Sequence, residues 1–447
     1  MSAKICIIGA GSAVFSMAMV GDLCLTPNLR GSQVTFMDIN QDRLDSIHQL
    51  ASRYAAELGI TLDLRKTTDR YTALEGADIV VNAALTAGHH RLRAGWDVAR
   101  THGYRWGGSL HVMHDEAYWI NFYQLQLFDS LITDMLAICP DAWYIQAANP
   151  VQAGITYVAR RYPQAKVVGL CHGFGGVYSI IDQLGLEREH CTFELPGVNH
   201  FIWLTKLFYK GQDAMPLIDR WIDEQGPAAW EKGGYGELSP KKCDLYRRIG
   251  AFPIGDTAGD GGGSWGWWYH TDQDTEQRWK EEPGRFWNRF FTGGEAEVAE
   301  IAKIGVDPNV RVTDHFPPEL SHESIIPMIE ALVCDTPRII LSNIPNRGGY
   351  VPGIPHDFQV EVPALVSRRG IQGIQTNGLP PAALAYLMRD CVAPVELELA
   401  AYTQHSRKLL LELIMTDPWT RSVEQANALI DDIAALPFNK VLGDHYR

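Results

Sequence analysis

The chain has 447 residues, of which 46% are hydrophobic and 21% charged, so it can bury a large core and is long enough for two domains. Its formal charge of −14 argues against nucleic acid or an anionic membrane as a partner, because both are bound through clustered lysines and arginines. The eight scattered cysteines do not resemble the framework of a secreted disulfide-rich protein. The apolar run near the N-terminus is too short for a signal peptide, and we expect a cytoplasmic protein.

The N-terminal part alternates short apolar runs with segments of helical length. Strands are predicted over residues 5–8, 33–37, 62–67, 78–83, 143–146 and 166–170. Helices are predicted between them, over residues 12–25, 41–57 and 116–138. Such alternation favours a parallel sheet covered by helices on both faces.

The alternation fades after about Pro196, where Trp, Gly and Pro become more frequent, and a long helix is predicted over residues 380–403. We therefore predict an α/β protein with two domains. Residues 1–196 are expected to form a Rossmann-like, doubly wound, NAD-binding domain. Residues 197–447 are expected to form an α+β domain that binds substrate and metal and mediates oligomerisation.

A glycine-rich turn lies between the first predicted strand and the first predicted helix. Gly9, Gly11 and Ser12 would let the backbone approach a pyrophosphate at the helix N-terminus, although Val14 replaces the third glycine of the usual fingerprint. Asp38 ends the second predicted strand, where a carboxylate accepts ribose hydroxyls and repels a 2′-phosphate. The sequence therefore predicts NAD rather than NADP, against the alternative of a turn that binds nothing.

Potential metal ligands follow later strands. Cys171 and His172 come directly after the strand at 166–170, and His200 ends another short apolar segment. A thiolate and an imidazole can hold one divalent ion and leave positions open for substrate oxygens. The alternative is that Cys171 and His200 are ordinary core side chains.

Three polar residues complete the candidate site. Asn149 ends the strand at 143–146 and could bind a substrate hydroxyl, or it could simply form a turn. Asp115 opens the long helix, where capping is an alternative to catalysis. Asp256 lies in a glycine-dense loop followed by tryptophans, a composition that suits a mobile lid or a solvated connection.

These segments together resemble glycoside hydrolase family 4, the NAD- and manganese-dependent glycosidases, whose fold is similar to that of lactate and malate dehydrogenases. The resemblance spans nearly the whole chain. It rests on Gly9-Ala10-Gly11-Ser12, Ala147-Ala148-Asn149-Pro150, Gly169-Leu170-Cys171-His172-Gly173, Gly197-Val198-Asn199-His200, Pro253-Ile254-Gly255-Asp256-Thr257, Asn343-Ile344-Pro345-Asn346 and Val360-Glu361-Val362-Pro363.

The resemblance implies cleavage by oxidation and elimination instead of the usual pair of carboxyl groups. Hydride passes from C3 of the sugar to NAD, a base removes the C2 proton, and the metal stabilises the charge that develops. The aglycone leaves, water adds at C1, and the hydride returns to C3. By position, Asp256 resembles the C2 base, with Tyr246 as the alternative, and Asp115 resembles the acid for the departing oxygen.

The resemblance also implies the binding residues. Cys171 and His200 resemble the ligands of Mn²⁺, and Asn149 resembles a sugar contact. The Cys-His-Gly-Phe sequence that contains His172 is similar to the branch acting on α-linked glucuronides or galacturonides, so the substrate would be a small uronide or oligosaccharide. Its C5 carboxylate needs a cationic partner, for which Arg347 is the candidate.

Two other classes of function compete with this interpretation. The first is an NAD-dependent dehydrogenase of a hydroxy acid or sugar acid, which would release NADH. The second is a non-catalytic sugar or nucleotide sensor on the same fold. The family resemblance and the many aromatic residues of the second half predict a homodimer or homotetramer.

Overall fold

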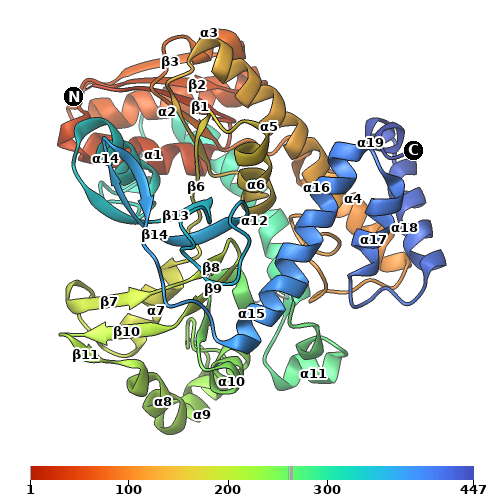
Figure 1. The fold of residues 1–447 in the computed structure, drawn as a ribbon. Coiled ribbons are helices and arrows are strands. Elements are labelled where there is room, and N and C mark those ends of the chain that lie inside the picture. Colours follow the sequence, from red (N-terminus) through yellow and green to blue (C-terminus); the bar gives the residue numbers. More distant parts are fainter. Residues whose placement is uncertain (1, 260, 262–264) are drawn as a thin grey trace.

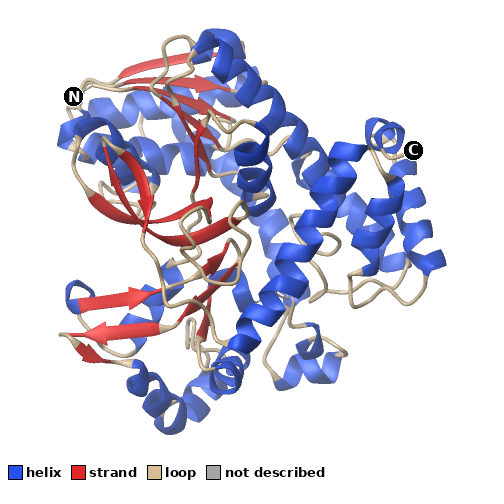
Figure 2. Cartoon of the chain, viewed as in Figure 1, coloured by secondary structure: helices blue, strands red, loops and turns tan. Residues whose placement is uncertain are grey.

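A computed structural model describes residues 2–259, 261 and 265–447, and its N-terminal half contains a parallel sheet flanked by helices (Figures 1 and 2). The parallel strands run side by side in the order β3-β2-β1-β4-β5-β6. Their bounds are β1 (Lys4–Ile8), β2 (Gln33–Met37), β3 (Asp63–Thr67), β4 (Ile79–Asn82), β5 (Trp143–Gln146) and β6 (Lys166–Gly169). This order is that of a doubly wound dinucleotide-binding sheet, and each strand lies within one residue of its predicted bounds.

The side chains of the helices between these strands show how each helix is buried. Helix α1 (Ala13–Leu25) buries apolar residues such as Met17, Val20 and Leu23 together with the polar Ser16 and Asp22. Helix α2 (Gln41–Glu57) instead buries one face that includes Leu44, Ile47 and Tyr54. Helix α5 (Tyr118–Ile138) begins two residues later than predicted, and its N-cap is Ala117. The capping role considered for Asp115 is therefore wrong, since the chain turns into the helix only after that residue.

The sheet continues beyond β6 with antiparallel strands that come from the second half of the chain. Strand β13 (Arg338–Pro345) pairs with β6 through Asn343 and Gly169. Among the described residues the full sheet has twelve strands, completed by β14 (Gln359–Ser367), β8 (Gly197–Val198), β9 (Phe201–Leu204), β12 (Phe252–Ile254) and β15 (Gly370–Gly373). One sheet thus crosses the predicted domain boundary at residues 196 and 197.

A separate three-stranded sheet lies beside this continuation (Figure 1). Its strands are β7 (Cys191–Glu194), β10 (Lys206–Tyr209) and β11 (Gln212–Asp213). Helices α7 (Gly175–Gln183), α8 (Met215–Glu224) and α10 (Pro240–Ile249) share a second apolar core with it. This core is distinct from the main one that fills the space around the large sheet.

The predicted helix at 380–403 contains a wider turn in its middle. Helix α15 (Pro381–Leu387) passes into a π-helical turn, η5 (Met388–Val392), and then into α16 (Ala393–Gln404). Pro394 explains the turn, because a proline has no N–H and its ring clashes with the carbonyl four residues earlier.

The C-terminal helices stand away from the large sheet, at one side of the molecule (Figure 1). Helices α17 (Arg407–Met415), α18 (Val423–Ala435) and α19 (Lys440–His445) gather there with α4 (Gly88–Thr101). No helix in the described ranges has both the length and the apolar character needed to cross a membrane.

We predict that Gly169→Val destabilises the protein by about 1–3 kcal/mol. A Cβ on Gly169 would lie 2.5 Å from Cγ1 of Val151 and 2.9 Å from Cβ of Asn343, so the added side chain would push β13 away from β6. Urea denaturation measures the loss. Lys166→Val, at the exposed start of the same strand, is the control and should change stability by about 0.5 kcal/mol or less. Equal losses in both variants would contradict the prediction.

Candidate active site

A cavity of about 530 Å³ opens at the carboxyl end of the parallel strands, where ligands bind in such folds. The residues that meet there are Asn149 after β5, Cys171 and His172 after β6, His200 between β8 and β9, and Asp256 in the 3₁₀ turn η3 (Gly255–Ala258) that follows β12. Five side chains predicted from separate parts of the sequence thus line one cavity. Phe15 of α1 lines the same cavity, so the glycine-rich turn at the start of α1 adjoins it.

A smaller cavity of about 140 Å³ shares Asn149, His200 and Asp256 with the first. Its other walls include Asp115, His114 and the aromatic side chains of α12 (Pro283–Val306), among them Trp287. Asp115 therefore lines the smaller cavity with Asn149, His200 and Asp256, whereas Cys171 and His172 line only the larger one.

His200 is the point where these segments meet. It is 7% exposed and has a φ of 62°, a left-handed conformation that side chains other than Gly rarely adopt. Its Nδ1 lies 2.7 Å from Oε1 of Glu116, and its Nε2 lies 3.6 Å from Oδ2 of Asp256. Burial disfavours the imidazolium, but Glu116, a hydrogen bond with Cys171 and the charge of Asp256 together raise the pKa of His200 well above its usual value.

Asp115 and Glu116 bring two carboxylates to this imidazole. One ligand atom each from Asp115, Glu116 and His200 lies within 4.8 Å of the others, as in a metal site. Asp115 also forms an ion pair with His114 and accepts a hydrogen bond from Nδ2 of Asn149 at 2.9 Å. Burial acts to raise the pKa of Asp115, but His114, His200 and Asn149 outweigh it, and the pKa is lowered. Asp115 is thus held as a carboxylate.

Glu116 and Glu361 were not predicted from the sequence. Glu361 lies on β14, is 1% exposed, and accepts a hydrogen bond from Nδ2 of Asn199 at 3.2 Å. Burial raises its pKa to about 7, although Asn199 and His200 act in the other direction. The available signals were weak: Glu116 belongs to a His-Asp-Glu run, and Glu361 is an acidic residue within an apolar strand.

The donor atoms of this site suit a divalent transition metal. They combine the thiol of Cys171, the imidazole of His200 and nearby carboxylates, which Mn²⁺, Co²⁺ and Zn²⁺ all accept. Burial raises the pKa of the Cys171 thiol, whereas its hydrogen bond with His200 lowers it. Glu116 bonds the far side of the His200 ring, as carboxylates do behind metal-binding histidines.

The glycine-rich turn has the geometry of a dinucleotide-binding loop. Gly9 has a φ of 80°, and a Cβ there would lie 2.5 Å from the backbone of Ala84, so only glycine fits. The amide of Gly11 donates to Oδ2 of Asp38 at 2.8 Å, which holds the carboxylate beside the turn. The amide of Ser12 donates to the carbonyl of Gly9 at 3.1 Å and closes the turn at the start of α1.

Two predicted residues lie elsewhere. Tyr246 is 7% exposed in the second core, where its hydroxyl donates to Oδ2 of Asp219 at 3.1 Å. Arg347 is exposed after β13 and donates to the carbonyl of Ala159 at 3.5 Å. Neither side chain lines either cavity. His172, in contrast, lines the larger cavity, and its Nδ1 lies 3.3 Å from Oε1 of Glu323.

Two buried lysines of α10 hold the turn that carries Asp256. Lys242 donates to the carbonyl of Gly255 at 3.0 Å and pairs with Glu237 at 2.5 Å. Lys241 donates to the carbonyl of Gly259 at 3.0 Å and pairs with Glu281. The two lysines therefore hold the turn at Gly255 and at Gly259. Residues 260 and 262–264 of the loop expected to form a lid lie outside the described residues.

Comparison with other proteins agrees with a dinucleotide-binding fold that has possible metal-binding side chains at the carboxyl edge of its sheet. Residues 4–187 match the model of the family 4 glycosyl hydrolases, and residues 195–420 match the model of the C-terminal domain of that family. The chain therefore belongs to family 4 of the glycosyl hydrolases, as its motifs predicted.

Full-length relatives include enzymes with different sugar specificities. The chain is 26% identical to an α-glucosidase of Erwinia rhapontici, over 96% of this chain and 97% of the relative. It is 21% identical to an α-galacturonidase of Thermoanaerobacter italicus, over 95% of this chain and 94% of the relative. Membership of the family alone therefore leaves the sugar open.

Solved structures confirm the predicted α/β fold class. A 6-phospho-α-glucosidase from gut microorganisms, in complex with NAD and Mn²⁺, has a TM-score of 0.80 at 17% identity, covering 97% of this chain and 98% of the other. A malate dehydrogenase of Cryptosporidium parvum has a TM-score of 0.52 at 13% identity, covering 90% and 100%. The similarity to malate dehydrogenases predicted from the sequence is thus present.

We predict that Lys241→Met destabilises the protein by about 3–5 kcal/mol, because the buried carboxylate of Glu281 loses its lysine partner and keeps only His270, whose Nε2 lies 3.7 Å away. The double variant Lys241→Met/Glu281→Gln should recover a large part of the loss. Unfolding in urea measures both. Lys280→Met is the control, since Lys280 forms an exposed ion pair with Glu231 that is worth about 0–1 kcal/mol. A loss in Lys241→Met no larger than in Lys280→Met would refute the prediction.

Proposed function

We propose that this protein is an NAD- and divalent-metal-dependent α-glycosidase that hydrolyses α-linked uronides, either α-glucuronides or α-galacturonides. The observation that carries the proposal is the convergence of Asn149, Cys171, His200 and Asp256 in one cavity that adjoins the nucleotide-binding turn. A plain dehydrogenase has no need for the thiol, imidazole and carboxylate donors gathered there.

In this proposal the parallel half of the sheet binds NAD. Asp38 accepts the ribose hydroxyls, while Gly9, Gly11 and Ser12 receive the pyrophosphate at the start of α1. Gly9 lacks the Cβ that would collide with Ala84, which allows the backbone this close approach. The cavity beside Phe15 then receives the nicotinamide and the sugar together.

Cys171 and His200 hold the divalent metal, for which Mn²⁺ is the expected ion, and Glu116 orients the His200 ring. When bound, NAD accepts and returns a hydride at C3 of the sugar, and the metal stabilises negative charge on the adjacent oxygens. Asn149 contributes its amide as a donor to a sugar hydroxyl, a role compatible with its bond to Asp115.

Asp256 acts as the base that removes the C2 proton. Its side chain is 51% exposed and lines both cavities, whereas Tyr246 is buried in another core, so proximity favours Asp256. Asp115 and His114 form a carboxylate and imidazole pair that lines the smaller cavity with Asp256. We assign to this pair the role of donating a proton to the departing oxygen.

The choice of a uronide depends on the residues after Cys171. His172 lines the cavity and its side chain is 55% exposed, so it can meet a carboxylate at C5 of the sugar. Arg347, the cation expected from the sequence, lies outside the cavity, and the proposal assigns carboxylate recognition to His172 instead. The α-galacturonidases among the relatives support this substrate class.

We predict that the protein releases nitrophenol from p-nitrophenyl α-D-glucuronide or α-D-galacturonide only when NAD, Mn²⁺ and a thiol reductant are all present. The corresponding α-glucoside and α-galactoside should be cleaved about tenfold or more slowly, because they lack the carboxylate that pairs with His172. Absorbance follows nitrophenol and NADH together. Accumulation of NADH would indicate a dehydrogenase, and faster cleavage of the neutral glycosides would refute the uronide assignment.

We predict that Asp256→Asn lowers kcat by about 10²–10⁴-fold, because it removes the base, while Tyr246→Phe retains most of the activity. Exchange of the C2 proton with deuterium from the solvent, followed by NMR of the sugar, reports the base directly. Asp256→Asn should stop this exchange. The reverse result, with exchange lost only in Tyr246→Phe, would make Tyr246 the base.

A further inference from the structure

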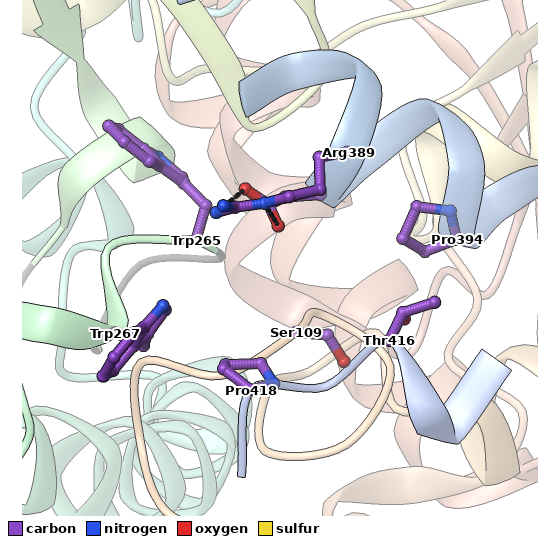
Figure 3. Close-up of a pocket in the computed structure, with 8 residues that line it drawn as sticks. Ser109, Trp265, Trp267, Arg389, Pro394, Thr416 and Pro418 are labelled. Carbon is purple, nitrogen blue, oxygen red and sulfur yellow. Dashed lines mark hydrogen bonds and ion pairs between the residues drawn. The ribbon is translucent and has the colours of Figure 1, made fainter. Parts of the chain in front are cut away.

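Another cavity, of about 200 Å³, is shown in Figure 3. Its walls come from the segment before α5, the aromatic segment that follows the turn of Asp256, the π-helical turn η5, and the chain after α17. The residues that line it differ from those of the two cavities described above. Neither the family motifs nor the proposed mechanism uses this space.

Two tryptophans line this cavity. Trp265 is 2% exposed, packs against Phe201 and Trp203 of β9 at ring-centroid distances of 5.2 and 5.6 Å, and donates to the carbonyl of Thr257 at 2.6 Å. Its ring points away from the other labelled side chains in Figure 3, whereas Trp267 is partly exposed. A partly exposed indole provides a rigid apolar surface on which the C–H face of a sugar ring can pack.

A charged pair lies across the cavity from Trp267 (Figure 3). Nε and Nη2 of Arg389 donate to the two carboxylate oxygens of Asp390, each at 2.8 Å. Neither bond uses Nη1 of Arg389, which can still donate to a ligand. Each carboxylate oxygen of Asp390 keeps a further lone pair with which to accept a hydrogen bond. Because the charges cancel, the pair suits a neutral polyhydroxylated ligand better than an anion.

Ser109 lines the cavity but offers no free hydroxyl to it. The residue is 6% exposed, its Oγ is buried, and its hydroxyl lies beside the carboxylate of Asp417, whose pKa it acts to lower. The backbone N–H of Ser109 donates to Oδ2 of the same carboxylate at 2.9 Å. Arg389 and Asp390 therefore provide the polar contacts of this wall.

The π-helical turn is a second, independent indication of function. Such turns are rare and occur frequently at functional sites. Both Arg389 and Asp390 belong to this turn and line the cavity, so the local departure from a regular α-helix presents the charged pair to it.

We propose that this cavity is a binding subsite for a neutral pyranose. The ring packs on Trp267, and its hydroxyls bond Arg389 and Asp390. A volume of about 200 Å³ is below the ~300 Å³ at which sites for larger ligands begin, which favours a single ring. The inference rests on the proposed function only in taking sugars as the ligands the protein meets, and binding requires neither NAD nor metal.

Saturation-transfer difference NMR with methyl α-D-glucopyranoside tests the proposal on the full chain, in EDTA and without NAD. We expect saturation transfer to the sugar in the unmodified protein. Binding should weaken about tenfold in Trp267→Ala and in Asp390→Asn, since each loses a contact worth about 1.4 kcal/mol or more. Asp432→Asn is the matched control, because Asp432, on α18, does not line this cavity and forms an ion pair with His102 at the surface.

A second variant separates this subsite from the catalytic cavity. In the double variant His172→Ala/Asp256→Asn, which alters two partly exposed side chains of the catalytic cavity, sugar binding should persist. Loss of binding in this variant, unchanged binding in Trp267→Ala and Asp390→Asn, or no saturation transfer at all would overturn the proposal. A failed uronidase assay would leave this result unaffected, so the two proposals fail separately.

Discussion

The contact between His200 and Glu116 joins parts of the molecule that are far apart in sequence. Glu116 precedes α5 in the parallel half, whereas His200 connects β8 to β9 in the antiparallel half. His200 has a left-handed backbone that costs of order 1–3 kcal/mol, and such strain persists only where the surroundings enforce it. Burial and the 2.7 Å contact with Glu116 provide that enforcement, so the imidazole presents its other nitrogen toward Asp256.

The two halves of the sheet divide the work of the site. The glycine-rich turn and Asp38 follow the parallel strands β1 and β2. Asn149 and Cys171 follow the parallel strands β5 and β6. The antiparallel strands deliver His200, just before β9, and Asp256, just after β12, and the antiparallel pairing of these two strands brings the residues together. The continuous sheet therefore sets the distance between the glycine-rich turn and Asp256.

The sequence predicts the strands, helices and glycine-rich turn well because these depend on local periodicity and on residue types with one dominant use. It also predicts Cys171, His200 and Asp256, whose positions at strand ends converge in any parallel or mixed sheet. It does not predict Glu116 or Glu361, because each acquires its role only through tertiary contacts with His200 or Asn199. For the same reason the sequence placed Arg347, which follows one of the motifs, in the site and left Tyr246 as an alternative base. The π-helical turn was likewise unpredicted, since a proline in a helix can also cause a kink or an end.

The electrostatics of the site are unsuited to hydrolysis by two carboxyl groups. That mechanism needs one carboxyl group with a raised pKa to protonate the leaving oxygen. Here Asp115 has a lowered pKa, with one oxygen paired to His114 and the other bonded by Asn149. Glu361, on β14, has a raised pKa, but it is 1% exposed and accepts a hydrogen bond from Asn199, which lies between β8 and β9. With Asp115 held as a carboxylate and Glu361 enclosed, neither group is placed to act as the protonated acid of that mechanism.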